Sequence, residues 1–233
     1  MKNKKKVILI RCICAVVVIA MAAGAVVLMN RSGKVADEQK APEATQAPVV
    51  TATPEPTKDP HEGMVRSNLT GEYITEKVAE KRPYAVIINN IEYANANQQG
   101  TSQIDVLYEA LAEGGITRML GVIQDVDKIK KLGSVRSARH YFVSFASEWD
   151  AIFCHFGQTK YAISKIEELG INNLSGLSAV GPVVYARDYS YKAPHNVFTT
   201  GKKMKKGAKK LGYRTKVKSD NVAEHFTFYE EDT

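Results

Sequence analysis

The sequence lacks the short motifs that mark the commonest enzyme classes. It contains no Walker phosphate loop, no G-x-G-x-x-G, no G-x-S-x-G, no H-E-x-x-H and no paired C-x-x-C. These absences argue against a P-loop nucleotide enzyme, a dinucleotide enzyme, a typical serine hydrolase and the common zinc enzymes. His155 and His195 also lack the spacing to nearby acids that marks a metal site, so we expect no metal and no cofactor.

Cysteine is scarce, and its positions exclude a disulfide framework. Cys12 and Cys14 lie in the apolar N-terminal run, and Cys154 stands alone among apolar neighbours. A single thiol in an apolar strand pattern is usually a buried small hydrophobic residue. We therefore expect Cys154 to be buried rather than catalytic.

Acidic residues are absent from the first 34 positions, which carry seven Lys or Arg side chains. An uncharged run of eighteen residues, Cys12 to Met29, follows the basic tip and, with residues 7–10, is long enough to cross a bilayer core of about 30 Å. We predict that residues 1–30 form a cytoplasmic basic tip and a transmembrane anchor, with residues 7–29 in the cell membrane and the rest extracellular. The alternative is a signal peptide cleaved at Ala20-Met21-Ala22, which releases a secreted protein.

Hydrophobic periodicity is absent from residues 31–66, which hold five of the eight prolines. This composition predicts a disordered, extended linker. The remaining residues, 67–233, carry 22 basic and 19 acidic side chains without a basic face interleaved with aromatics, so we expect no nucleic-acid partner.

Residues 67–233 show alternating strand and helix patterns that predict an α/β domain. A layered sheet of about four or more strands with flanking helices is the expected fold class. Two short edge strands are expected over 215–217 and 226–229. The main strands are expected over 84–88, 116–124, 151–156 and 182–187, and the helices from Ser102 to Gly114-Gly115, over 137–149, over 159–169 and over 200–211.

Three arginines stand beside small residues in the stretch from Gly114 to His140. Arg118 opens a predicted strand, and Arg136 and Arg139 flank a predicted helix start. Guanidinium groups and helix N-termini both bind carboxylate or phosphate, so this pattern predicts an anion site. The alternative is that Arg136 and Arg139 form structural ion pairs, with Asp125, Asp127 or Asp150 as partners.

Polar residues near the ends of other predicted helices and strands are further candidates for ligand binding or catalysis. His195 lies in a polar loop with Arg187, Lys192 and Asn196, where it could act as a general acid or base or bind an anion. His155 lies in a predicted strand, where a core histidine is the usual explanation.

A pair of glutamates and a run of lysines could each be either an ordinary solvated surface or part of a functional site. Glu109 and Glu113 are spaced to share one helical face, which is either solvated or places Glu113 near Arg118 as a catalytic candidate. The lysines of the helix over 200–211 either form a solvated face or contact anionic lipid headgroups or wall polymer.

Six ordered motifs lie between residues 68 and 215: NLTG, RPYAVIINN, SQIDVLYEALAEGGITRML, GSVRSARHYF, WDAIFCHFG and ARDYSYKAPHN. Together they resemble the YerB-like lipoprotein family, a bacterial family of unknown function. The resemblance implies an extracytoplasmic, membrane-attached protein and supplies no reaction. Family members typically attach by a lipidated cysteine, whereas Cys14 precedes most of the apolar run. They also typically continue into a second, C-terminal domain, which we expect this chain to lack.

Together these features predict a membrane-anchored extracytoplasmic domain that binds an anionic cell-envelope ligand or partner, such as a wall polymer, a lipid headgroup or a protein. One alternative is an envelope hydrolase or transferase that acts on an anionic substrate, with His195 as acid/base and Arg136, Arg139 and Arg187 stabilising developing negative charge. Another is a pure protein-interaction module. The candidate ligand-binding residues, including those that match the family motifs, are Arg118, Arg136, Arg139, His155, Arg187, Lys192, His195 and Asn196.

Overall fold

A computed structural model describes residues 60–218 and 224–229 of the chain. The predicted membrane anchor, residues 7–29, and residues 31–59 of the predicted linker lie outside these residues. The last three residues of the predicted linker, Met64–Arg66, form a short strand, so the linker prediction is wrong at this end. Within the described part, no helix has the length and apolar character needed to cross a membrane.

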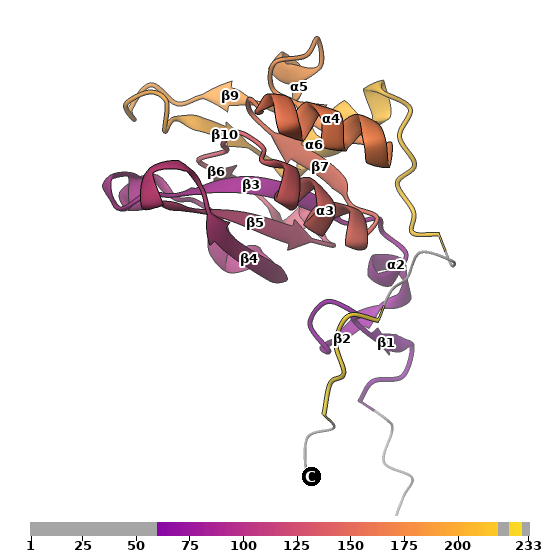
Figure 1. Cartoon of the computed structure of the whole chain (residues 1–233). Coiled ribbons are helices and arrows are strands. Elements are labelled where there is room, and N and C mark those ends of the chain that lie inside the picture. The colour runs from indigo at the N-terminus through magenta and orange to yellow at the C-terminus, as the bar shows by residue number, and fades with distance from the viewer. Residues whose placement is uncertain (1–59, 219–223, 230–233) are drawn as a thin grey trace, which may run out of the picture. The chain divides into compact units, whose positions relative to one another are not determined.

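A five-stranded mixed sheet forms the centre of the domain (Figure 1). The central strand β3 is antiparallel to β5 on one side and parallel to β7 on the other. The strands, in spatial order, are β4 (Val106–Leu111), β5 (Thr117–Ile123), β3 (Tyr84–Asn90), β7 (Ile152–His155) and β8 (Asn173–Ser175).

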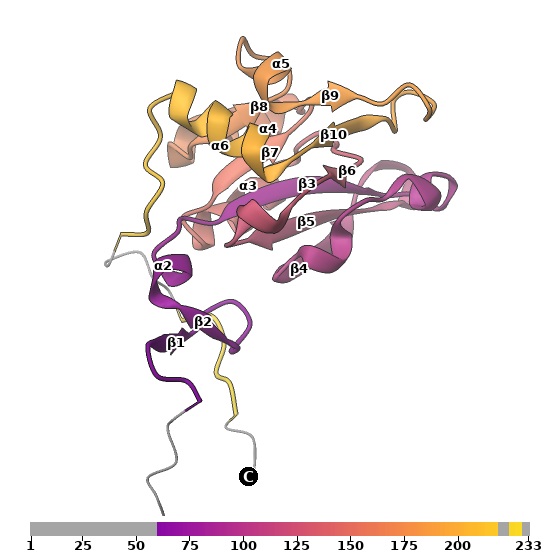
Figure 2. The same cartoon turned by 180° about the vertical axis from the view of Figure 1, so that it is seen from behind.

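Both faces of the sheet are covered, which explains the unbroken apolar sequence of β3. Ala85 and Ile87 face a core under helices α3 (His140–Glu148) and α4 (Lys160–Leu169). Val86 and Ile88 face the opposite core, which α5 (Gly181–Val184) and α6 (Gly201–Lys210) cover (Figures 1 and 2). Because neither face of such a strand meets solvent, its apolar residues need not alternate with polar ones.

Smaller elements complete the domain. The segments around β6 and β10 pair in a three-stranded sheet on the α6 side, in the order β6-β10-β9. These elements are β1 (Met64–Arg66), β2 (Tyr73–Thr75), α2 (Glu76–Ala79), β6 (Leu132–Gly133), α5 (Gly181–Val184), β9 (Ala186–Arg187), β10 (Val197–Thr199) and α6 (Gly201–Lys210), with 3-10 turns η1 (Glu92–Asn97), η2 (Thr101–Gln103), η3 (Glu113–Gly115) and η4 (Val126–Lys128).

The structure confirms the α/β class, the first three predicted strands and the helices over 137–149, 159–169 and 200–211. Helix α4 shows why its ends could be read from the sequence. The Thr159 side chain accepts a hydrogen bond from the Ala162 N–H, and Gly170 ends the helix in the left-handed conformation with φ 58°. These are common N-terminal and C-terminal caps.

The predicted helix from Ser102 to Gly114-Gly115 is wrong, because the longest regular element of this segment is the edge strand β4. Its residues alternate between half-buried and exposed, and it pairs along its whole length with β5. Leu107, Tyr108 and Leu111 fit a helical stripe, whereas the half-buried face of the strand is Val106, Tyr108 and Ala110, so tertiary pairing overrode the helical spacing. The two glycines adopt positive φ of 69° and 74° in the turn to β5.

The predicted strand over 182–187 is also wrong in its first half. Pro182 to Val184 belong to helix α5, and only Ala186 and Arg187 are strand. Strand β8 was not predicted, because its three residues are too few to give a periodic signal. The expected edge strands are absent from the described residues, where Lys216 forms a single bridge to Lys81 and residues 226–229 join no strand.

Candidate anion-binding site

The carboxyl ends of β3 and β7 lie at the same edge of the sheet because the two strands are parallel. Helices α3 and α4 both begin at this edge. Their leading segments are joined by a parallel bridge between Ala138 and Gln158 and by a 3.4 Å hydrogen bond from the Thr159 N–H to the Ala138 carbonyl. Two helix N-termini, with their free N–H groups and positive dipole ends, therefore lie side by side.

Arg118 is the most deeply buried charge at this edge. It lies opposite Asn89 in the β3–β5 register, and its Nη1 donates a 3.0 Å hydrogen bond to the Ser137 carbonyl. Burial, and then the positive charges of Arg139 and Arg136, lower the pKa of Arg118 to about 10. The three predicted arginines therefore lie within electrostatic reach of one another.

Arg139 binds the one carboxylate that the structure places among these arginines. Its Nε and Nη2 donate to the two oxygens of Glu113, and its Nη1 donates to the carbonyls of Ser137 and Ala138 at 3.1 and 2.9 Å. The hydrogen bonds from Arg139 lower the pKa of Glu113 to about 2. Glu113 is therefore ionised and hydrogen-bonded to Arg139. Its single negative charge offsets only one of the three positive charges of the arginines.

The expectation that Glu109 and Glu113 share a helical face is wrong. Glu109 lies on strand β4 and accepts a 2.9 Å hydrogen bond from the Asn90 Nδ2, whereas Glu113 lies in the turn η3. The structure does place Glu113 near Arg118, since Arg118 contributes to the lowered pKa of Glu113.

Arg136 connects the arginines to the His195 loop. Its Nη1 donates a 3.0 Å hydrogen bond to the Pro194 carbonyl. Burial, and then the charge of Arg136, lower the pKa of His195, so the imidazole is biased toward its neutral form. The edge of the His195 ring also meets Tyr93, with ring centroids 5.5 Å apart.

Four buried polar atoms near this edge have no hydrogen-bond partner among the described residues. Asn89 and Ser134 are adjacent, since the Asn89 N–H donates to the Ser134 carbonyl at 3.0 Å. Buried polar atoms are almost always paired, so a group of unpaired ones indicates a place for a ligand or for water. The four atoms are Asn89 Nδ2, Ser134 Oγ, Arg136 Nε and His195 Nδ1.

A cavity of about 340 Å³ opens beside the arginines, between the start of α3, the start of α4 and the β4–β5 turn. Glu113 and Arg139 line it, and His195 does not. Its other lining residues are Leu111, Ala112, His140, Tyr141, Thr159, Lys160 and Tyr161.

A family model described as "Protein of unknown function (DUF3048) N-terminal domain" matches residues 69–214. The chain belongs to this family. It is 40% identical over 152 residues to the putative lipoprotein YerB of Bacillus subtilis (strain 168), which covers 65% of this chain and 45% of YerB. The crystal structure of YerB from Bacillus subtilis is similar with a TM-score of 0.61 and 38% identity, covering 65% of this chain and 51% of that one.

These comparisons confirm the YerB-like resemblance. The chain spans about half the length of these relatives. The matched part of the DUF3048 domain contains the three arginines, Glu113 and the His195 loop.

The remaining predicted residues of this DUF3048 domain have other partners. His155 is a core histidine, with Nδ1 2.8 Å from the Gly157 carbonyl and Nε2 3.3 Å from Asn173 Oδ1. The Nη1 of Arg187 donates a 2.7 Å hydrogen bond to Asn196 Oδ1, and Lys192 is exposed. The arginine cluster, defined as Arg118, Arg136 and Arg139, is therefore only part of the predicted set.

The alternative that pairs Arg136 and Arg139 with Asp125, Asp127 or Asp150 is wrong. Asp125 and Asp127 pair with Lys81, and Asp150 pairs with Arg82 and Arg214. Sequence reasoning missed Asn89, Ser134 and Tyr93. A polar residue directly after an apolar strand run was the available signal for Asn89.

Proposed function

We propose that this DUF3048 domain binds an anionic ligand of the cell envelope at the arginine cluster. The carrying observation is that three guanidinium groups share one sheet edge with a single neighbouring carboxylate and four unpaired buried polar atoms. Burying like charges together is costly, and an anion offsets that cost.

The geometry suits an oxyanion such as phosphate or carboxylate. Guanidinium groups donate two parallel hydrogen bonds to such groups, and the adjacent N-termini of α3 and α4 add backbone donors and positive dipole ends. Asn89 and Arg136 each hold a free donor atom for the same ligand.

The proposal is binding rather than catalysis. Glu113, with its pKa lowered to about 2, is a poor general acid or base near neutral pH. His195 lies outside the cavity that Glu113 lines, and no hydrogen bond or ion pair within residues 60–218 and 224–229 joins the two.

The envelope location rests on the relative named as a putative lipoprotein and on the predicted anchor at residues 7–29. We propose a single-pass membrane protein with the domain outside the cell. Fractionation of cells that express the full chain, or a chain that starts at residue 31, tests this: the anchor predicts that only the full chain sediments with membranes. Release of the full chain into the medium after cleavage would contradict it.

The anion site is tested by calorimetric titration of the purified full chain with inorganic phosphate, wall-polymer fragments and lipid headgroups. We expect Arg136→Gln to weaken binding about tenfold, as for loss of a charge-assisted hydrogen bond. Arg66→Gln is the matched control, because Arg66 bonds the Tyr229 carbonyl and does not contact the cluster. Absence of binding to every probe, or equal loss in both variants, would contradict the proposal.

A further inference from the structure

A larger cavity lies at the opposite end of β3 from the arginine cluster. It has a volume of about 740 Å³, within the range of small-molecule sites. Tyr84, the first residue of β3, and Gln124, which follows β5, both line it. Helix α6 and residues 212–216 contribute the rest of the wall together with α2 and η4.

Two buried polar atoms of this cavity have no hydrogen-bond partner in the described part of the chain: the Tyr84 hydroxyl and Gln124 Oε1. Their side chains are only 4% and 8% exposed. The Gln124 amide is held in place, since its Nε2 donates to the carbonyls of Ala79 and Lys81 at 2.8 and 3.3 Å. Its oxygen is therefore a fixed acceptor that lacks a donor.

The Tyr84 hydroxyl complements this acceptor. Burial raises the pKa of Tyr84, so the hydroxyl keeps its proton and is a donor near neutral pH. A ligand that satisfies both atoms must donate to one and accept from the other, and an alcohol hydroxyl does both.

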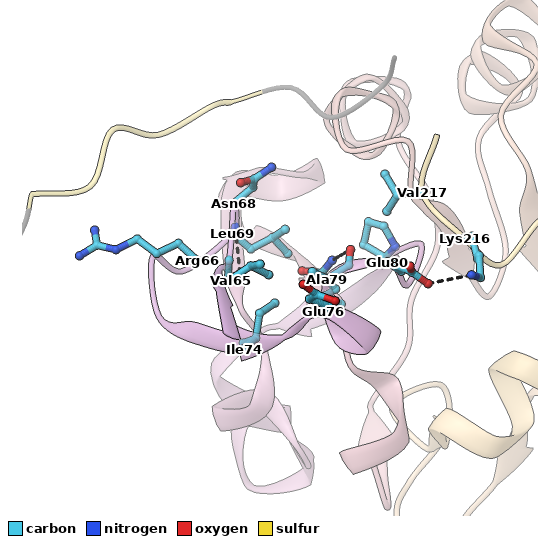
Figure 3. A pocket seen from close by; sticks show the side chains of 13 residues that line it. Val65, Arg66, Asn68, Leu69, Ile74, Glu76, Ala79, Glu80, Lys216 and Val217 are labelled. Carbon is cyan, nitrogen blue, oxygen red and sulfur yellow. Dashed lines mark hydrogen bonds and ion pairs between the residues drawn. The ribbon is translucent and has the colours of Figure 1, made fainter. Parts of the chain in front are cut away.

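The rim of the cavity is basic. Six Lys or Arg side chains line it against two acids, Glu80 and Asp127. Asp127 is already paired with Lys81 and Lys205, and Glu80 is paired with Lys216 at 2.7 Å (Figure 3).

Both rim acids are thus neutralised, and two ammonium groups remain available. The side-chain ammonium groups of Lys77 and Lys209 form no ion pair or hydrogen bond within the residues that the structure describes. An ammonium is a three-donor cation that suits phosphate oxygens. Glu80, Gln124 and Lys216 also line a neighbouring cavity of about 590 Å³, so the two cavities adjoin. Figure 3 shows the smaller cavity.

We propose that this cavity is a second ligand site, independent of the arginine cluster, for a phosphorylated polyol. The phosphate binds Lys77 and Lys209 at the rim, and a hydroxyl reaches Tyr84 and Gln124. Two sources carry this chemistry: a phospholipid headgroup and a soluble polyol-phosphate polymer.

Calorimetric titration of the full chain with glycerophosphoglycerol, a soluble phosphodiester with free hydroxyls, tests the site. We expect Lys209→Gln to weaken binding about tenfold and Tyr84→Phe about fivefold, as for a charged and a neutral hydrogen bond. Tyr84→Phe removes only the unpaired hydroxyl, and Lys209 is exposed, so both variants keep the fold. Lys210→Gln is the matched control, since Lys210 is exposed on the same helix but does not line the cavity.

The proposal would be overturned if the chain did not bind glycerophosphoglycerol, or if Lys210→Gln weakened binding as much as Lys209→Gln. It would also be overturned if inorganic phosphate bound as tightly as glycerophosphoglycerol. If Arg136→Gln weakened glycerophosphoglycerol binding and Lys209→Gln did not, the ligand would be assigned to the arginine cluster, and the proposal of a second site would be overturned. Monomeric dihexanoyl phosphatidylglycerol separates the two sources. Tighter binding than glycerophosphoglycerol assigns a lipid headgroup, and equal or weaker binding assigns a soluble polymer; either result, with Lys209 dependence, supports the site.

Discussion

Asn89 on β3 lies directly opposite Arg118 on β5, and the two side chains are only 2% and 4% exposed. They are the polar ends of two strands whose other buried side chains are almost all apolar. The Arg118 guanidinium is bonded to the Ser137 carbonyl, whereas Asn89 Nδ2 has no partner in the described residues. An unpaired buried donor costs about 1–3 kcal/mol, which a ligand at this edge would recover.

Replacement of Glu113 by Gln is expected to strengthen anion binding. The change removes the carboxylate that competes for Arg139 and leaves the arginine cluster with more net positive charge. Because Glu113 is largely exposed, the loss of folding stability is expected to be about 1 kcal/mol or less. Phosphate titration of the variant measures the first effect and urea unfolding the second.

Glu72→Gln serves as its control, because Glu72 is an exposed acid in the turn before β2. It makes the same change in net charge at a distance from the arginines. A gain in phosphate affinity of the same size in Glu72→Gln would show that total charge, not the Glu113–Arg139 pair, sets the affinity.

The Glu113–Arg139 pair also predicts an acid-dependent contribution to stability. Arg139 lowers the pKa of Glu113 from 4.5 to about 2, so the folded state binds a proton less readily than the unfolded chain. The contribution of the Glu113–Arg139 pair to the free energy of unfolding is present above pH 4.5 and is lost as the pH falls toward 2. The difference in unfolding free energy between the unmodified chain and Glu113→Gln is expected to shrink over this interval, and a constant difference would refute the assignment.

His155 predicts a second pH dependence at higher pH. Burial lowers the pKa of His155 below its ordinary 6.5, so the unfolded chain binds a proton that the folded core excludes. Stability is therefore fully present above pH 6.5 and declines below it. Unfolding measured from pH 8 to 5 should show a shallower decline in His155→Gln than in His140→Gln, a change at an exposed histidine.

Gly201 predicts a large packing cost at the start of α6. A Cβ at this position would lie 1.6 Å from the Val126 carbonyl oxygen, which is backbone and cannot rotate away. We expect Gly201→Ala to destabilise the domain by at least about 1–3 kcal/mol. Lys202→Ala, at the exposed neighbouring position, is expected to stay within about 0.5 kcal/mol in the same thermal or urea unfolding assay.

The sequence predicted the elements whose local signals agree with their tertiary environment. Strand β3 has no polar residue until Asn89, and α4 carries Thr159 and Gly170 as caps, so both were recognisable. Strand β4 was not, because Leu107, Tyr108 and Leu111 have helical spacing, whereas the packed face of the strand is Val106, Tyr108 and Ala110. Pairing with β5, a contact between segments, decided it.

The candidate sites were also predicted only where local sequence signals were enough, without contacts between distant segments. Arg118, Arg136 and Arg139 were found from their small neighbours, and the strand pattern already favoured a core position for His155. Arg187 could not be separated from the three arginines by sequence. The second cavity depends on segments distant in the chain, from Lys77 to Lys216, and only the folded backbone brings these together.

Strand β4 has one more consequence, for the behaviour of the purified domain. It forms one edge of the five-stranded sheet, and its outward row is Leu107, Glu109 and Leu111, with the two leucines 51% and 68% exposed. Open strand edges with apolar side chains invite pairing with another chain. The carboxylate between the leucines disfavours an edge-to-edge dimer in the register that sets the two Glu109 side chains opposite each other, because like charges opposed across a strand pair repel.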